Sequence, residues 1–144
     1  MVARAETRHG SAVRPWTSKV GEDDVVAGAV EVLAIADVLA LTRADPADSP
    51  FSDEERAYAS GKSDPDRRLA ARLAAKRAAV RLLAGGVELR DVEVLRGRGA
   101  PPRLRLSPRA AERLAALGAT RTLVSLTHER GHAAASVLFL RGAG

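Results

Sequence analysis

Apolar and polar positions along this chain follow a helical period over one long stretch, residues 64–83. Four apolar residues recur there at helical spacing, namely Leu69, Leu73, Val80 and Leu83. Asp64 and Pro65 open the stretch, and they are typical of the first positions of a helix. Gly85 and Gly86 follow it and are typical of a helix end. The pattern predicts one long helix with an apolar stripe that packs against the core.

Other segments show strand patterns or helix start signals. The stretch from Val25 to Leu41 is almost continuously apolar and rich in Val, which predicts a strand buried on both faces over part of its length. Ser52 and Glu55 have the spacing of a capping box, so we expect a short helix there, with Glu54 and Glu55 as acids of its first turn. Alternation predicts strands over residues 87–95, 103–106, 121–127 and 132–140, and a start signal at residues 107–108 predicts a helix over 109–117.

The order of these elements is strand, helix, helix, hairpin, helix and hairpin, which indicates an α+β domain. We expect a mainly antiparallel sheet packed with the long central helix. Residues 1–24 carry charges, Gly, Ser and Pro without periodicity, which predicts a flexible leader. Residues 25–144 then form a single domain, long enough for one hydrophobic core. Aromatic residues make up only 3% of the chain, so Leu, Val and Ala must build that core.

Composition excludes some chemistry and favours an anionic partner. The chain has no Cys, which excludes disulfides, thiolate metal sites and a cysteine nucleophile. Its net charge of +5 favours an acidic protein or a polyphosphate ligand. No aromatic residue is interleaved with the arginines to stack on bases, so we expect no nucleic acid partner. No stretch reaches the roughly 18 apolar residues of a membrane span, and no secretory signal is evident, so we expect a cytoplasmic protein.

Basic residues lie on two faces of the long predicted helix. Arg77 is in phase with the apolar stripe, and a guanidinium that keeps its proton needs an anion beside it when it is buried. Arg68, Arg72 and Lys76 form an i, i+4 row on the neighbouring face. We therefore expect negative groups to meet this helix. Lys76 itself is either a solvated lysine or a residue that binds phosphate as a point charge.

Two further residues have both a structural and a functional interpretation. Asp37 interrupts the first apolar stretch, where an unpaired carboxylate is costly. It either caps the following turn or serves as a metal ligand or an acid of a phosphate site. His128 follows the strand predicted over residues 121–127. It is either an exposed turn histidine or a hydrogen-bond donor or base held at the end of a strand.

Four motifs in order, spread over about residues 32–140, resemble the holo-acyl-carrier-protein synthases, the small trimeric branch of the 4′-phosphopantetheinyl transferases. The segment AIADVLAL keeps Asp37 of a G-I-G-x-D-I-V-E-I motif but lacks its glycines and its Glu. The segment RLAAKRA is similar to R-F-A-A-K-E-A; it keeps Arg72 and Lys76 and has Arg77 in place of the Glu. DVEVL followed by GAPPRLRL is similar to D-I-E-V-L and G-K-P-Y-L, and VSLTH is similar to V-S-I-(S/T)-H.

The resemblance implies a phosphopantetheinyl-transferase-like fold and transfer of 4′-phosphopantetheine from coenzyme A to a serine of an acyl carrier protein. It also implies a homotrimer with active sites between subunits. Asp37 matches one of the two acidic residues that hold Mg²⁺ on the coenzyme A pyrophosphate in the family. Lys76 and His128 match residues of the coenzyme A and phosphate site, and Arg72 and Arg77 lie beside Lys76 on the same helix. By this resemblance the catalytic set is Asp37, Lys76, Arg77 and His128.

Arg77 stands where the family has its second metal ligand, and this opposes a magnesium site. Mg²⁺ requires carboxylate oxygens, and a neighbouring guanidinium repels a dication. Mg²⁺ with Glu sums to one positive charge, as does Arg alone, so we expect Arg77 to replace the metal by clamping a pyrophosphate or by pairing with Asp37. The prediction is transfer with altered or weakened metal dependence. The alternatives are a divergent member that binds a carrier protein or coenzyme A without transfer, and a basic scaffold protein without a small-molecule site.

Overall fold

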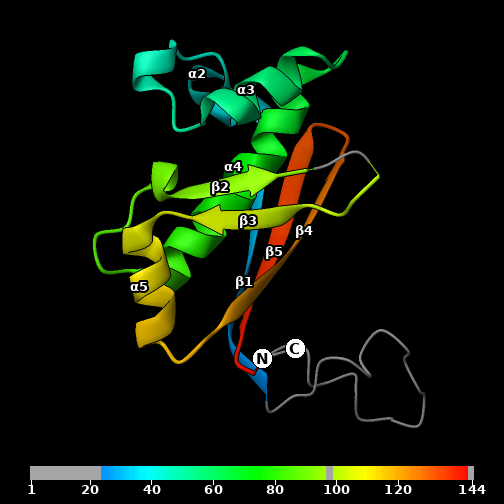
Figure 1. Cartoon of the computed structure of the whole chain (residues 1–144). Helices are drawn as coiled ribbons and strands as arrows, with labels where there is room; N and C mark the ends of the chain where they lie inside the picture. Colours follow the sequence, from blue (N-terminus) through cyan, green and yellow to red (C-terminus); the bar gives the residue numbers. More distant parts are fainter. Residues whose placement is uncertain (1–23, 97–98, 143–144) are drawn as a thin grey trace, which may run out of the picture.

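The computed structural model describes residues 24–96 and 99–142, so the predicted leader lies outside the described residues except for its last position. Three long strands form one antiparallel sheet in the order β1-β5-β4. These strands are β1 (Val25–Ala34), β4 (Arg121–Glu129) and β5 (His132–Leu140). A separate antiparallel hairpin pairs β2 (Val92–Leu95) with β3 (Arg103–Leu106). Figure 1 shows the hairpin crossing α4, and the predicted α+β class with antiparallel sheets is confirmed.

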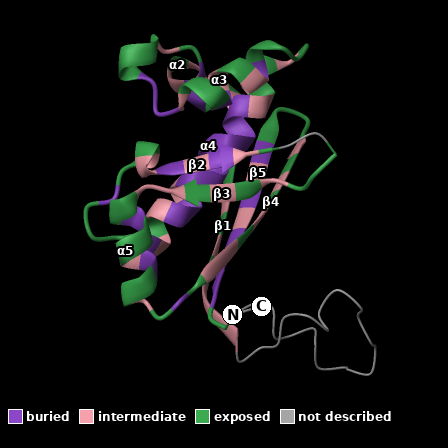
Figure 2. Cartoon of the chain, in the orientation of Figure 1, coloured by how far each residue is buried: buried purple, intermediate pink, exposed green. Residues whose placement is uncertain are grey.

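The long helix α4 (Pro65–Leu83) is the centre of the structure and confirms the predicted element. It contacts the three-stranded sheet, the β2–β3 hairpin and α3 (Asp53–Ser60). Alanines on several sides of α4 let these neighbours approach closely, and Figure 2 shows the helix buried along most of its length. Asp64 is the N-cap residue and Pro65 begins the helix, as predicted, but the Asp64 side chain makes no cap hydrogen bond and instead accepts from Arg68 at 3.1 Å. The helix ends before Gly85 and Gly86, whose positive φ angles favour glycine.

The first strand is shorter than predicted. β1 ends at Ala34, and the chain continues as the 3₁₀ helix η3 (Ile35–Val38) and the short helix α2 (Leu39–Thr42). At this point the Ile35 N–H donates to Gly131 O of the β4–β5 turn at 2.8 Å. A short apolar run has no periodicity that separates a strand from a helix, so this boundary was not readable from the pattern.

The short helices follow their capping signals closely. Ser52 Oγ accepts from the Glu55 N–H at 3.1 Å and Glu55 Oε1 accepts from the Ser52 N–H at 2.8 Å, so the predicted capping box of α3 is confirmed. Ser107 caps α5 (Pro108–Ala116) in the predicted place. The strand predicted over residues 87–95 is wrong in its first half, where η5 (Leu89–Asp91) forms instead. There the Glu88 N–H donates to Asp91 at 2.7 Å and turns the chain. A further 3₁₀ turn, η4 (Pro46–Asp48), precedes α3.

The β4–β5 hairpin is longer than predicted. β4 continues to Glu129, and His128 lies opposite Ala133 in the ladder rather than in a turn. Only Arg130 and Gly131 form the turn, and both have positive φ angles, as a two-residue hairpin loop requires. His128 is therefore carried by a strand, which fixes its direction.

The two faces of the three-stranded sheet differ. The face toward α4 is buried and carries alternate residues of β5, namely Ala133, Ala135, Val137 and Phe139. The opposite face leaves large apolar side chains exposed, with Val30 at 64%, Val32 at 62% and Leu123 at 43% exposure. In the described part of the chain, no helix is both long enough and apolar enough to cross a membrane.

Candidate functional site

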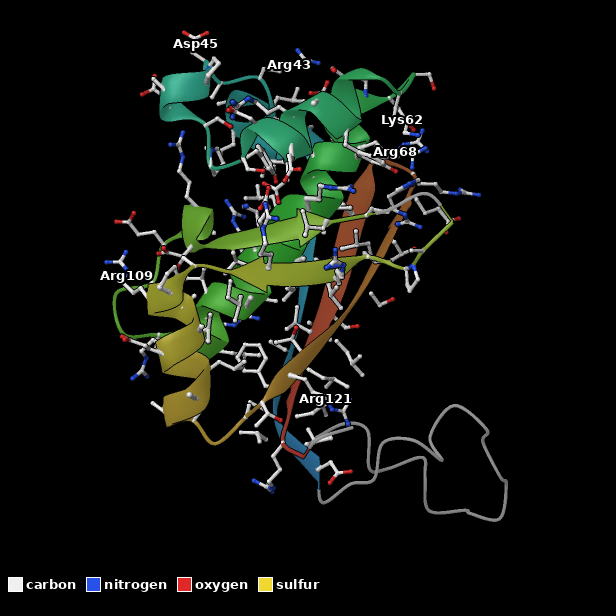
Figure 3. The ribbon with its side chains drawn as sticks, in the orientation of Figure 1. Arg43, Asp45, Lys62, Arg68, Arg109 and Arg121 are labelled. Carbon is white, nitrogen blue, oxygen red and sulfur yellow. The ribbon has the colours of Figure 1, made fainter. Side chains whose placement is uncertain are left out.

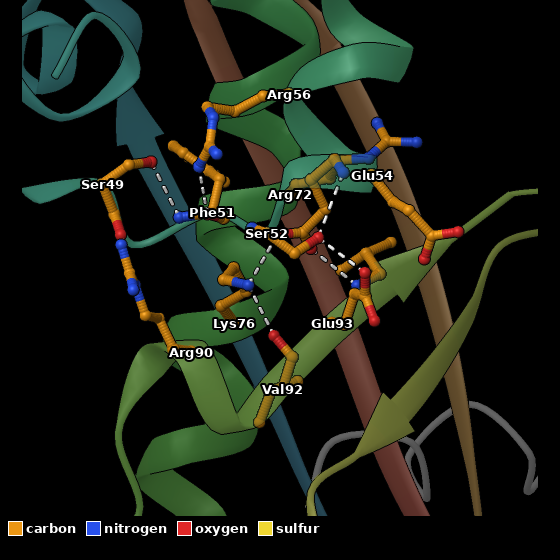
Figure 4. Close-up of polar contacts among 12 residues, drawn as sticks. Ser49, Phe51, Ser52, Glu54, Arg56, Arg72, Lys76, Arg90, Val92 and Glu93 are labelled. Carbon is orange, nitrogen blue, oxygen red and sulfur yellow. Dashed lines mark hydrogen bonds and ion pairs between the residues drawn. The ribbon is translucent and has the colours of Figure 1, made fainter. Parts of the chain in front are cut away.

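Lys76 lies at the point where α4 meets α3 and β2. Its Nζ donates to Glu55 Oε1 at 2.8 Å and to Val92 O at 2.5 Å. The side chains of Lys76 and Glu55 are 1% and 0% exposed. Burial lowers the pKa of Lys76, and the charge of Glu55 acts in the opposite direction. Figure 4 shows Lys76 reaching from α4 toward the carbonyl of Val92 on β2, and the expectation that a negative group meets this helix is confirmed at Lys76.

Glu55 has a larger role than the helix-start acid predicted from its spacing. Besides the ion pair and the cap, its Oε2 accepts from the Val94 N–H at 2.7 Å. One carboxylate therefore joins α3, α4 and β2. The sequence contains a signal for this burial, because Phe51, Glu55 and Ala59 recur at four-residue spacing and each is 1% exposed. That spacing places Glu55 on the apolar face of α3.

A basic cavity of about 250 Å³ lies one turn away from Lys76 on α4. Its walls come from α3, α4, the end of β2 and the end of β4. The polar residues that line it are Tyr58, Arg68, Arg72, Arg96, Thr127 and His128. Figure 3 shows Arg68 close to where α3 meets α4, at the end of the molecule that also carries Arg43. The cavity thus gathers three guanidinium groups and one imidazole with no acid among its lining residues.

Arg72 is the most deeply buried of these cations, at 3% exposure. Its Nε has no hydrogen-bond partner, and Nη1 donates to Arg68 O at 3.4 Å. Its guanidinium carbon lies 4.2 Å from the centre of the Tyr58 ring, a cation–π contact. Burial lowers the pKa of Arg72, and no carboxylate among the described residues forms an ion pair with it. A buried, unneutralised guanidinium with a free N–H is a favourable site for an anionic oxygen.

His128 and Arg72 are the two predicted site residues that the structure brings to this cavity. His128 is partly buried, and its Nδ1 lies 3.4 Å from Arg67 Nη1. Asp64, which does not line the cavity, forms ion pairs with Arg67 at 3.3 Å and with Arg68 at 3.1 Å. The imidazole therefore lies near several guanidinium groups, of which Asp64 already pairs with two.

Asp37 and Arg77 lie elsewhere along α4. Asp37 is exposed on η3, and Arg77 is half-buried rather than facing the core. The predicted stripe position of Arg77 is wrong, because α4 is covered on several sides and its buried cations are Arg72 and Lys76. Within residues 24–96 and 99–142, neither the Asp37 side chain nor the Arg77 side chain forms a hydrogen bond or ion pair, so the expected contact between them is not made.

The surroundings of Asp37 and Arg77 are nevertheless well defined. The segment from β1 to α2 runs antiparallel to α4 and is tied to it at both ends. At one end Arg81 Nη1 donates to Glu31 Oε1 at 2.6 Å, and at the other Thr42 Oγ1 donates to Asp66 Oδ1 at 2.8 Å. Asp37 and Arg77 both fall between these two ties. In the described part of the chain, no three His, Cys, Asp or Glu side chains lie close enough to hold a metal ion.

Known proteins whose sequences are similar to this chain are holo-[acyl-carrier-protein] synthases. No family model matches the sequence. The holo-[acyl-carrier-protein] synthase of Anaeromyxobacter sp. strain K is 45% identical over 96 residues, which cover 65% of this chain and 73% of that protein. The synthase of Nitratidesulfovibrio vulgaris is 51% identical over 74 residues, 49% of this chain and 60% of that protein.

Solved structures agree with the sequence comparison. The acyl carrier protein synthase of Mycobacterium tuberculosis superposes with a TM-score of 0.63 at 32% identity, over 80% of this chain and 96% of that one. The Helicobacter pylori synthase, solved in complex with coenzyme A, has a TM-score of 0.60 at 18% identity, over 78% of this chain and 99% of that one, and supports the fold alone.

Proposed function

This chain belongs to the holo-[acyl-carrier-protein] synthase family, and on that premise we propose that it transfers 4′-phosphopantetheine from coenzyme A to a serine of an acyl carrier protein. The serine oxygen forms a bond to the phosphorus that carries the pantetheine, the pyrophosphate bond of coenzyme A breaks, and adenosine 3′,5′-bisphosphate leaves. The hydroxyl proton of the serine passes to a base. Membership of the family supports the type of reaction. The basic cavity around Arg72 supports the choice of residues that bind coenzyme A.

Arg72 and His128 are proposed to bind a phosphate of coenzyme A. The free Nε–H of Arg72 and the absence of an acid among the cavity's lining residues support this role. Arg96 adds positive charge to the same cavity, whereas Arg68 already pairs with Asp64 at 3.1 Å. A phosphate there replaces the missing counter-ion of Arg72, which makes its binding more favourable than at an exposed arginine.

The residues at the family's magnesium position do not fit that metal. Asp37 stands alone there, since no cluster of three ligand side chains occurs among the described residues. Arg77, which has no ion-pair partner among the described residues, adds a positive charge on the helix where the family has its second acidic ligand. We propose that Arg77 contacts the pyrophosphate of coenzyme A directly, in place of the metal. The Arg77 guanidinium has no partner in the described part of the chain, and it lies on α4 between the Arg81–Glu31 ion pair and the Thr42–Asp66 hydrogen bond, which supports this arrangement.

The Arg at position 77, where the family has Glu, also favours a second candidate function, in which this protein binds coenzyme A or a carrier protein without transferring phosphopantetheine. Mass spectrometry separates the two. The protein is incubated with an apo carrier protein and coenzyme A, once with Mg²⁺ and once with a chelator. We expect the carrier to gain the mass of phosphopantetheine in both reactions. No gain with several carriers contradicts the transferase and leaves the binding protein.

We further propose that the open face of the sheet packs against further copies of the chain in a homotrimer. Val30 and Val32 project from β1, which is an edge strand, and Leu123 projects from β4 at the other edge. Apolar side chains grouped on one sheet face are typical of an interface between subunits. Light scattering after gel filtration gives the mass in solution, and Val32→Lys is expected to shift it to the monomer. A monomeric wild-type protein contradicts the proposal.

The acyl carrier protein is proposed to dock through charge. A net charge of +5 supports an acidic partner, whose attraction weakens as salt screens it. Carrier binding that is independent of ionic strength contradicts this mode of docking.

A further inference from the structure

The cavity around Arg72 depends on three separate elements. Tyr58 comes from α3, Arg72 from α4, and Arg96 directly follows β2. The chain has no Cys, so no disulfide holds these elements together. Their relative positions therefore depend on the non-covalent contacts between α3, α4 and β2.

Glu55 makes buried contacts that join all three elements. It belongs to α3, its Oε1 accepts from Lys76 of α4 at 2.8 Å, and its Oε2 accepts from the Val94 N–H of β2 at 2.7 Å. It is 1% exposed, so water does not compete for either contact.

The ion pair also lies next to the contact that orients Arg72. Tyr58 follows Glu55 by three residues, and Arg72 precedes Lys76 by four, so each pair shares one helix face. α3 and α4 therefore meet in two adjacent contacts. One is the ion pair between Glu55 and Lys76, and the other is the guanidinium of Arg72 at 4.2 Å from the Tyr58 ring. A rotation of α3 that breaks the first contact also displaces the second.

We propose that Glu55 is a positioning residue for coenzyme A. Its contacts with Lys76 and Val94 hold Tyr58 and Arg96 around Arg72, and this arrangement determines the affinity of the cavity for a phosphate of coenzyme A. The inference rests on the proposed function. Lys76 then acts as the anchor of Glu55 and not as a direct phosphate ligand, since its ammonium already donates to Glu55 and to Val92 O inside the protein.

Steady-state kinetics of Glu55→Gln test this role. Glutamine keeps the size of the side chain and one acceptor oxygen but removes the charge that holds Lys76. We expect the KM for coenzyme A to rise about tenfold, with kcat and the KM for the carrier protein within about twofold of wild type. Glu54→Gln is the matched control, because Glu54 is the neighbouring residue, is 66% exposed and pairs with Arg105 at 2.9 Å. It is expected to behave as wild type.

A double variant guards against loss of folding. Glu55→Gln leaves a buried ammonium without its anion, and Glu55→Gln with Lys76→Met removes that unpaired charge. The double variant is expected to fold and still to show the raised KM for coenzyme A. A wild-type KM in the folded double variant overturns the inference, because positioning then does not need the ion pair.

The single tyrosine of the chain provides a readout that activity does not. Fluorotyrosine labelling places one ¹⁹F nucleus at Tyr58, beside the Arg72 guanidinium. In the absence of ligand, Glu55→Gln is expected to shift or broaden this resonance, and Glu54→Gln is expected to leave it unchanged. If wild type does not bind coenzyme A by calorimetry, the proposed function fails. If wild type binds it and Glu55→Gln changes neither the KM nor the ¹⁹F resonance, the positioning role alone fails.

Discussion

Two cations lie one turn apart on α4 and are almost equally buried, yet their surroundings are opposite. Lys76 is surrounded by acceptors, with the Glu55 carboxylate and the Val92 carbonyl both in reach of its ammonium. The Arg72 guanidinium lies over the Tyr58 ring, its buried Nε–H has no hydrogen-bond partner, and the residue lines a cavity. A cation that the fold already neutralises holds the structure together, whereas a cation that the fold leaves unneutralised is available to a ligand. The residue type and its helical spacing do not separate these two cases.

Removing Lys76 tests the structural half of this comparison and should have the largest effect. Lys76→Met leaves the carboxylate of Glu55 buried without its cation, which is expected to lower the free energy of unfolding by about 3–5 kcal/mol. Urea unfolding at neutral pH measures the change. Lys62→Met is the control, because Lys62 is exposed and contacts the Tyr58 ring only from outside, at 4.8 Å. A loss for Lys76→Met below about 1 kcal/mol contradicts the structural role.

Removing Arg72 tests whether the unneutralised cation binds the ligand. Arg72→Met leaves no unpaired carboxylate behind, so its stability is expected to stay within about 1 kcal/mol of wild type. The dissociation constant for coenzyme A is expected to rise about 10–100-fold, the range for one lost charge-assisted hydrogen bond. Titration calorimetry measures this change, and Arg103→Met, at an exposed position on β3, is the control. An Arg72→Met protein that binds coenzyme A as wild type does removes Arg72 from the binding site.

Local signals in the sequence predicted the elements, but not which cations are buried. The capping box of Ser52 and Glu55 and the stop at Gly85 and Gly86 depend on neighbouring residues, so they were readable. The ends of β1 and of the strand after Gly86 depend on distant contacts and were placed wrongly. The burial of Lys76 could not be read from an apolar stripe, because alanines let neighbours cover α4 on several sides.

The candidate site was predictable to a similar extent. The row of Arg72 and Lys76 correctly indicated that the helix needs a negative partner, and Glu55 supplies it. The different roles of Arg72 and Lys76 could not be predicted from the sequence. The capping box of α3 already explained why an acid stands at position 55, so nothing indicated that Glu55 also pairs with Lys76. The buried role of Glu55 depends on β2, which lies about 40 residues further along the chain and packs beside α3 in the fold.

Arg77 provides a third case, a half-buried cation without a partner in the described part of the chain. Arg77→Glu restores a second carboxylate between the two ties that hold the β1–α2 segment to α4. Wild-type transfer is expected to be insensitive to a chelator, and the variant is expected to lose about tenfold in rate when chelated. Electron paramagnetic resonance of Mn²⁺ gives an independent measure of binding, with Arg103→Glu as the charge-matched control. Mn²⁺ bound equally well by wild type contradicts the replacement of the metal by Arg77.

The ion pair of Asp66 with Arg43 at the other end of that segment should matter least, because it lies near the surface. Arg43 and Thr42 donate to Asp66, which holds the pKa of its carboxyl below the ordinary 3.8. The unfolded chain therefore takes up this proton first as the pH falls. The stabilisation is present above pH 3.8 and is lost as the pH falls through the folded pKa. Asp66→Asn is expected to reduce stability by about 0.2–1 kcal/mol at pH 7 and to show a shallower decline below pH 4 than wild type. Urea midpoints measured across this range, with Asp48→Asn as an exposed control, test the sign; a steeper decline in Asp66→Asn contradicts the assigned pKa direction.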